Sequence, residues 1–174
     1  MELLGSRRIY DGKVVNLRVD TLRNGEGKSH DVEVVEHAQA VVVIVRPRPG
    51  EMLLVRQYRH PLAREHWEVV AGVMNPGESP EDAAARELRE ETGYVAHRVT
   101  RLWSAFSAPG FSDELLHFCV VDGYDIGEPE RGEGEEDMQL GIFAIEELWR
   151  QIRADELPDS KTQIAVLWAL SGRG

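Results

Sequence analysis

Hydrophobic and polar residues alternate in the first part of the chain, and this alternation predicts half-buried β-strands over residues 7–23. Val15, Leu17 and Val19 are each followed by a polar residue. An Asp-Gly pair before them predicts a hairpin turn, and a glycine-rich stretch after them predicts a second turn before a strand over residues 29–36. The pattern therefore predicts a small antiparallel β segment, which is too small to hold a hydrophobic core alone.

A continuous run of apolar residues at 40–45 predicts a central strand that is covered on both faces. Further strands are expected within residues 52–56, 95–106, 115–121 and 138–143. Two later stretches, 146–154 and 159–170, place apolar residues at helical spacing, which fits helices that cover a sheet. Either Asp159 or Ser160 is the expected cap of the second helix. The expected buried side of that helix consists of Ile164, Leu167, Trp168 and Leu170.

Between these strands lies a loop rich in glycine and proline that leads into a well-marked helix. Ser79 can cap the free N–H groups at the helix start, and Pro80 suits the first helical position because its missing N–H is not needed there. Asp82, three residues after the cap, completes an arrangement close to a capping box. Gly93 stands where a left-handed C-terminal cap is expected. A helix is therefore predicted between Ser79 and Gly93.

The end of this helix carries Glu87, Glu90 and Glu91, whose i, i+3, i+4 spacing places three carboxylates on one face. A solvated acidic face is the ordinary explanation of such a cluster, although like charges at this spacing weaken a helix. Two features favour a cation site instead. Arg86 lies four residues before Glu90 and can orient it, and the preceding loop supplies another acid, Glu78. Clustered carboxylates are the ligands that hard cations such as Mg²⁺ prefer.

Gly72, Glu78 and residues 86–94 together resemble the Nudix box of the Nudix hydrolases at every fixed position. Tyr94 occupies a position that is usually aliphatic in that family. The resemblance implies an α/β fold, namely an α/β/α sandwich with a mixed sheet, preceded here by the small N-terminal β segment. It also implies hydrolysis of a nucleoside diphosphate derivative with Mg²⁺ or Mn²⁺, two or more ions per site. The metal ligands that the resemblance implies are Ala71 (through its carbonyl), Glu87, Glu90 and Glu91, and the catalytic residues are Glu78, Arg86, Glu90 and Glu136.

Composition and charge narrow the range of partners. The chain has 174 residues, enough for one domain with a full core, and a net charge of −11 that argues against nucleic-acid binding. Cys119 is the single cysteine, which excludes an intrachain disulfide and indicates a reducing compartment. No apolar run is long enough for a signal peptide or a membrane span. A cytoplasmic protein with no membrane partner is therefore expected.

A second stretch of the sequence indicates which branch of the Nudix family the chain resembles. In residues 56–61, Arg56 and Arg59 flank Tyr58 and could hold a phosphate and stack a base, although a solvated strand end is the alternative. This stretch and Pro109, sixteen residues beyond Gly93, resemble the ADP-ribose pyrophosphatase branch of the family. The substrate-binding residues that this resemblance implies are Arg18, Arg56, Arg59, Glu68, Pro109, Gly110 and Glu114.

The acidic loop 127–137 is the expected source of the general base, although a purely solvated loop is the default for such a composition. By similarity, a glutamate just before the strand at 138–143 deprotonates or orients the attacking water. Glu136 matches this position best, with Glu135 and Glu133 as close rivals in a repetitive loop.

The resemblance also implies that residues 1–38 are exchanged or packed across a homodimer and that residues 39–174 form the Nudix domain. A sheet edge on the main domain is the alternative for the N-terminal segment. The expected reaction is hydrolysis of ADP-ribose to AMP and ribose 5-phosphate. Open alternatives are GDP-mannose, another nucleotide sugar, FAD or a damaged nucleotide as substrate, or a non-catalytic sensor of such a ligand.

Overall fold

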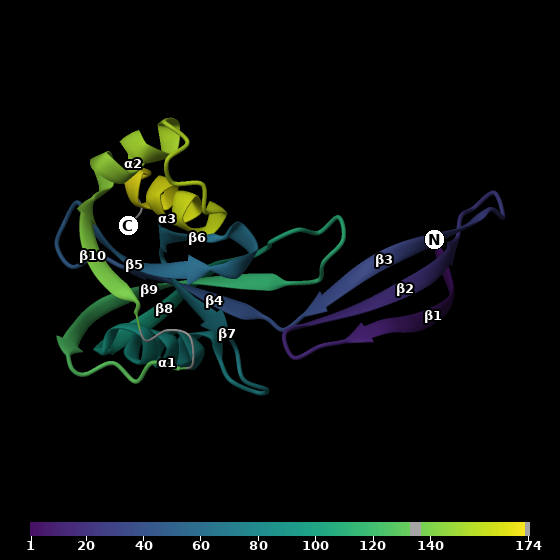
Figure 1. Ribbon diagram of the computed structural model, residues 1–174, viewed down its shortest axis with the longest axis horizontal. Helices are drawn as coiled ribbons and strands as arrows, with labels where there is room; N and C mark the ends of the chain where they lie inside the picture. The colour runs from purple at the N-terminus through teal and green to yellow at the C-terminus, as the bar shows by residue number, and fades with distance from the viewer. Residues whose placement is uncertain (133–136, 173–174) are drawn as a thin grey trace. The chain divides into compact units, whose positions relative to one another are not determined.

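The structure is a computed structural model that describes residues 1–132 and 137–172. These residues divide into two compact units, whose strands and helices are labelled in Figure 1. Unit 1 comprises Met1–Ala40 and Ser104–His117, and unit 2 comprises Val41–Trp103 and Phe118–Gly174.

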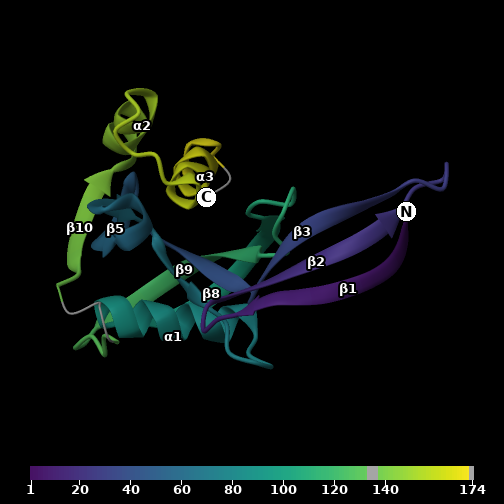
Figure 2. The ribbon, with the colours of Figure 1, turned by 45° about the vertical axis from the view of Figure 1, so that its right-hand side comes forward.

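Unit 1 is built on a three-stranded antiparallel sheet with the strand order β1-β2-β3 (Figure 2). Its strands are β1 (Glu2–Asp11), β2 (Val15–Arg23) and β3 (Ser29–His37). The Gly12 N–H donates to the Val15 carbonyl at 3.1 Å, so the expected turn is confirmed. The strand β1 begins at Glu2, earlier than the hydrophobic pattern predicted.

The second segment of unit 1 is attached to β3 by hydrogen bonds from the β3 backbone. The Val35 N–H donates to the Phe111 carbonyl at 2.8 Å, and the His37 N–H donates to the Asp113 carboxylate at 2.9 Å. From the sequence, only residues 1–38 were predicted to form the N-terminal segment. The pattern of Ser104–His117 gave no indication that these residues belong to the same unit.

The strands that follow β3 form two further sheets. They are β4 (Ala40–Val45), β5 (Glu51–Arg59), β6 (Arg64–Glu68), β7 (Val70–Val73), β8 (Tyr94–Phe106), β9 (Leu115–Ile126) and β10 (Gln139–Ala144). One sheet has the order β7-β4-β9-β8 and the other has the order β10-β5-β6. A short 3-10 helix, His60–Leu62, connects β5 to β6.

Three helices cover the two sheets in unit 2. They are α1 (Pro80–Thr92), α2 (Ile145–Arg153) and α3 (Ser160–Leu170). Figures 1 and 2 both show α1 on one side of the strands and α2 with α3 on the other, which is the expected α/β/α sandwich. In the part of the chain that the structure covers, no helix is long and apolar enough to span a membrane.

One hydrophobic cluster of unit 2 is shared by α1, the four-stranded sheet and β5. Every residue of β4 is buried, as its continuous apolar run predicted. Ala83, Ala84 and Leu88 of α1 are completely buried and belong to the same hydrophobic cluster as residues of this strand. Cys119 of β9 lies in the same cluster, and burial raises the pKa of its thiol to about 12, so the thiol is not reactive at neutral pH.

The predicted buried side of α3 is wrong at three of its four positions, since only Trp168 is partly buried. Ile164, Leu167 and Leu170 are 37%, 49% and 41% exposed, and the buried residues are instead Thr162, Ala165 and Val166. Most positions of this helix are apolar, so periodicity alone did not define its inner face. Hydrogen bonds define it, because the buried Thr162 hydroxyl accepts from the Val69 N–H at 2.9 Å.

Candidate active site

Both ends of α1 are fixed by local interactions that the sequence predicted. The Ser79 hydroxyl accepts from the Asp82 N–H at 3.1 Å and donates to the Asp82 carboxylate at 2.6 Å. At the other end, Gly93 has φ +77° and donates its N–H to the Arg89 carbonyl at 2.8 Å. The two caps set the first and last residues of α1. They therefore fix the position of the last turn, which carries the glutamates.

The guanidinium of Arg86 gathers three carboxylates at this end of the helix. Its Nη1 donates to Glu87 at 2.6 Å and to Glu90 at 3.0 Å, which confirms the expected pairing with Glu90. Its Nε and Nη2 donate to the two oxygens of Glu78 at 2.8 and 2.9 Å. This bidentate pair holds the pKa of the Glu78 carboxyl at about 2, although partial burial opposes the charge.

A glycine is required at position 72 because a carboxylate packs against its backbone. A Cβ built on Gly72 would overlap the carboxylate of Glu87. Gly72 lies on β7 beside Ala71, so Glu87 lies against the strand whose carbonyl was expected to bind metal. Glu87 and Glu91 are 9% and 2% exposed, a burial that carboxylates reach only when they are paired or bind a cation.

The donor set at the end of α1 suits a hard cation. The Glu87 carboxylate lies beside the backbone of β7, and oxygen atoms are the ligands that Mg²⁺ and Mn²⁺ prefer. Among the residues whose placement is described, no three acidic, histidine or cysteine side chains converge into a ready metal site. Arg86 accounts for this, since it draws Glu87 and Glu90 onto its own guanidinium. The ligand assignment to Ala71, Glu87, Glu90 and Glu91 stays a prediction.

The family model described as the NUDIX domain matches residues 36–164, which include the loop, the caps and the carboxylate cluster. The chain belongs to the Nudix family. Hydrolases of this family generally depend on a divalent metal ion.

Curated relatives extend this Nudix assignment over nearly the whole chain. An ADP-ribose pyrophosphatase of Bacillus subtilis is 33% identical over 94% of this chain and 89% of its own length. A methanol dehydrogenase activator of Bacillus methanolicus is 36% identical, with 92% and 88% covered. An ADP-ribose pyrophosphatase of Mycobacterium tuberculosis is 37% identical, with 95% and 81% covered.

A solved structure supports the fold. The crystal structure of an ADP compounds hydrolase superposes with a TM-score of 0.86 over 99% of this chain and 95% of that one. Because the two sequences are 20% identical, this likeness shows the fold alone.

The one departure from the Nudix box has a packing explanation. Tyr94 is 9% exposed, and its ring stacks on Tyr124 with centroids 4.4 Å apart. A buried aromatic side chain here serves the core, as the usual aliphatic residue would.

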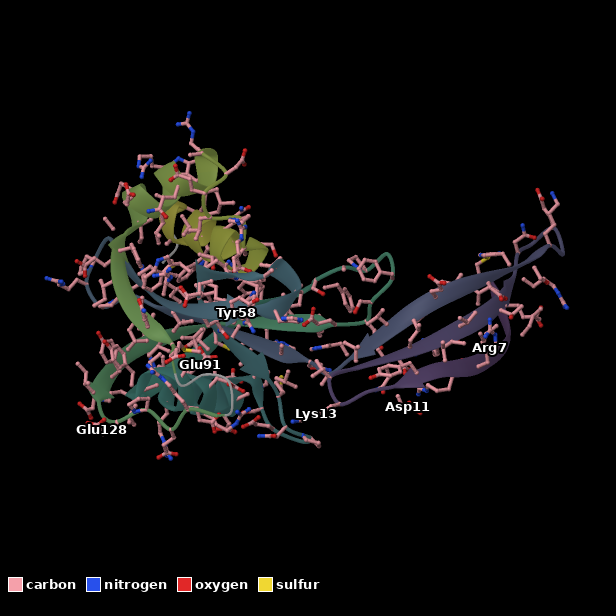
Figure 3. All side chains as sticks on the ribbon, in the orientation of Figure 1. Arg7, Asp11, Lys13, Tyr58, Glu91 and Glu128 are labelled. Carbon is pink, nitrogen blue, oxygen red and sulfur yellow. The ribbon has the colours of Figure 1, made fainter. Side chains whose placement is uncertain are left out.

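The acidic loop after β9 starts against the Nudix helix. The Glu130 N–H donates to the Glu90 carbonyl at 3.0 Å, and the Arg131 Nε donates to the Glu91 carbonyl at 3.1 Å. Figure 3 labels Glu91 on α1 and Glu128 at the beginning of this loop. The candidate bases lie outside the described residues: Glu133, Glu135 and Glu136.

The two arginines of the expected phosphate site lie on opposite faces of β5. Arg56 forms an ion pair with Glu65 at 2.7 Å, whereas the Arg59 Nε donates to Glu68 at 2.8 Å. Because side chains alternate along a strand, residues three positions apart point in opposite directions. The structure therefore brings Arg59 and Glu68 together and separates Arg56 from them.

Glu68 is 1% exposed and has a second cation partner that the sequence gave no reason to expect. Lys161 Nζ lies 3.3 Å from Glu68 and 2.7 Å from the Asp159 carboxylate. Burial opposes the charge on Lys161, but the two carboxylates outweigh it and raise its pKa. Lys161 belongs to no motif, and only the expected cap at Asp159 lay close to it in the sequence.

The remaining predicted substrate residues belong to unit 1. Arg18 donates to Asp20 at 3.1 Å and also binds Glu36, and these hydrogen bonds raise its pKa, with that to Glu36 contributing most. The Glu114 carboxylate lies 3.4 Å from the His37 ring. Pro109 and Gly110 lie in an exposed turn. Their role toward a substrate stays a prediction.

Proposed function

We propose that this Nudix protein hydrolyses the diphosphate of ADP-ribose and releases AMP and ribose 5-phosphate. The observation that carries the proposal is the group of carboxylates around Arg86 and Gly72 at the end of α1. The choice of substrate is supported by two relatives named ADP-ribose pyrophosphatase, at 33% and 37% identity.

The proposed metal ligands are Glu87, Glu90 and Glu91 with the Ala71 carbonyl. A bound Mg²⁺ or Mn²⁺ ion would offset the charge of the diphosphate and polarise it toward attack. Arg86 orients Glu87 and Glu90, because one guanidinium nitrogen donates to both. Arg59 adds positive charge for the phosphates. Burial opposes this charge, but Glu68 and Glu91 outweigh the effect of burial and raise the pKa of Arg59.

A glutamate of the loop after β9 is the proposed base for the attacking water. The anchoring of Glu130 and Arg131 to the last turn of α1 supports this, because it brings the start of the loop to the carboxylates. Replacing Glu133, Glu135 and Glu136 separately by Gln tests the assignment. A large loss of rate at position 136 alone is expected, and small, equal losses at all three positions would refute a loop base.

We also propose that two chains pair through unit 1. Its β1 is exposed over its whole length, and Leu3, Ile9 and Tyr10 on it are 59%, 45% and 58% exposed. Exposed apolar side chains on a sheet of three strands favour association with another surface. A second copy of the chain is the partner that the family resemblance implies.

The substrate is tested by incubating the protein and Mg²⁺ or Mn²⁺ with ADP-ribose, GDP-mannose, a further nucleotide sugar, FAD and a damaged nucleotide. The fastest hydrolysis is expected for ADP-ribose. The relative named methanol dehydrogenase activator supports a second candidate, activation of another protein. Absence of hydrolysis with every compound and both metals would overturn the enzyme proposal and favour this second one.

A further inference from the structure

A serine, a histidine and a glutamine of unit 1 form a hydrogen-bonded row that the proposed hydrolysis does not use. The Ser104 Oγ lies 2.8 Å from the Nδ1 of His117, and the His117 Nε2 lies 2.7 Å from the Gln39 Oε1. Ser104 is on β8, His117 is on β9, and Gln39 stands immediately before β4. Because β4, β9 and β8 are consecutive neighbours in one sheet, the sheet itself brings the three side chains together.

The glutamine determines which nitrogen of the His117 ring carries the proton. An amide oxygen can only accept a hydrogen bond, so the His117 Nε2–H donates to Gln39. In the neutral ring the Nδ1 is then the acceptor, and the Ser104 hydroxyl donates to it. His117 is 5% exposed, and the two hydrogen bonds hold its ring in this orientation.

The same arrangement activates hydroxyl nucleophiles in enzymes. A base lies within hydrogen-bond reach of the nucleophile, and a third group orients the base. Ser104 is exposed whereas His117 is buried, so a reagent in solution can reach the hydroxyl. The ordinary alternative is a polar pair that only joins two strands, which would leave Ser104 no more reactive than another exposed serine.

The surroundings of Ser104 favour an uncharged aromatic ester as its reaction partner. Phe106 lies two positions further along β8, so its side chain leaves the same face of the strand as Ser104, and it is 58% exposed. An exposed aromatic ring beside the nucleophile offers a packing surface for an aryl group. The net charge of −11 disfavours the approach of an anionic acyl donor.

We propose that Ser104 is an acylation site that takes an acyl group from an aryl ester, with His117 as the base. The Ser104 Oγ attacks the carbonyl carbon of the ester while its proton passes to the His117 Nδ1. The bond from the carbonyl carbon to the aryl oxygen then breaks, and the departing aryloxide takes this proton and leaves as the phenol. The product is an ester of Ser104, and the reaction uses neither a metal ion nor the Nudix carboxylates.

Incubation of the full chain with p-nitrophenyl acetate and a metal chelator tests the site. Peptide mapping by mass spectrometry locates each acetyl group, and Ser107, another exposed serine, serves as the internal comparison. Ser104 should be acetylated at least about tenfold faster than Ser107. Equal labelling of the two serines, or no acetyl group on Ser104, would overturn the proposal. Because no metal ion is present, the result is independent of whether ADP-ribose is hydrolysed.

Two variants of Gln39 separate activation of the serine from a merely structural role. Gln39 is exposed, so neither variant should change the thermal midpoint. Gln39→Glu places a carboxylate on the His117 Nε2–H and stabilises the imidazolium that forms during proton transfer, so Ser104 should be acetylated about tenfold faster. Gln39→Ala removes the orienting oxygen and should slow acetylation about tenfold. Ser107→Ala is the control and should leave the acetylation of Ser104 unchanged. Equal rates in the natural chain and both Gln39 variants would show that the pair only joins strands and would overturn the proposal.

Discussion

At the scale of single residues, Arg86 explains how several carboxylates can share one end of α1. Its guanidinium donates to Glu78, Glu87 and Glu90, and this offsets the repulsion between the two helix carboxylates, Glu87 and Glu90. These three carboxylates outnumber the one guanidinium, and Glu91 adds a fourth, so the group is suited to a further cation.

Glu78 makes the stability of this arrangement depend on pH. Its folded-state pKa of about 2 lies below the ordinary value of 4.5, so its stabilising effect is complete above that value and disappears as the pH falls toward 2. Glu78→Gln should therefore lower the free energy of unfolding at about pH 6 and have a smaller effect at about pH 3. Urea unfolding at both values measures this, and a difference that stays constant or grows in acid would contradict it.

Gly72 is the second residue whose identity the geometry dictates. Gly72→Ala should place a methyl group on the Glu87 carboxylate, cost about 1–3 kcal/mol of stability and reduce hydrolysis at least about tenfold. Gly25→Ala is the matched control, because nothing lies within 4 Å of the added Cβ at that position. The packing account fails if the two variants unfold at the same urea concentration and hydrolyse substrate at the same rate.

At the scale of elements, α1 was predictable because its signals are local. Ser79, Asp82 and Gly93 act within a few residues, and the helix ends where they indicated. The buried strand β4 was predictable for a similar reason, since a short run of six apolar residues, most of them β-branched, is typical of a covered strand. The buried side of α3 was not predictable, because it depends on Val69, which is distant in sequence from Thr162.

The hydrogen bond between α3 and the strand region can be tested directly. Thr162 is completely buried, and its hydroxyl accepts from Val69 and donates to Asp159 at 2.6 Å. Thr162→Val should destabilise the protein by about 1–3 kcal/mol, because it leaves the Val69 N–H buried without an acceptor. Thr100→Val, at an exposed position of β8, is the control. Equal stability of the two variants in urea would refute this role.

The candidate site shows the same division between local and distant information. The carboxylates and Arg86 were predictable because they occupy one short stretch with fixed spacing. Lys161 was not, because its contact with Glu68 joins segments far apart in the chain. The opposite orientation of Arg56 and Arg59 follows from the strand pleat once β5 is known to extend to Arg59.

At the scale of the whole molecule, the exposed apolar residues of β1 are the feature that unit 1 leaves uncovered. If two chains pair there, the mass in solution should be twice the 19.6 kDa of one chain. Ile9→Asp should shift the protein toward single chains in analytical ultracentrifugation, because it places a charge on the shared surface. Leu170→Asp, which alters an exposed apolar residue on α3, should not. A natural chain that sediments at 19.6 kDa at all concentrations would exclude this assembly.

The most direct test of the central claim is the identification of products from ADP-ribose and Mg²⁺ by ion-exchange chromatography. AMP and ribose 5-phosphate are expected in equal amounts. Glu91→Gln, which removes one charge from the buried carboxylate cluster, should lower the rate by about 10²–10³-fold with an unchanged fold, and Glu81→Gln in the first turn of α1 should not. Intact ADP-ribose after prolonged incubation, or a Glu91→Gln variant as fast as the natural chain, would contradict the account.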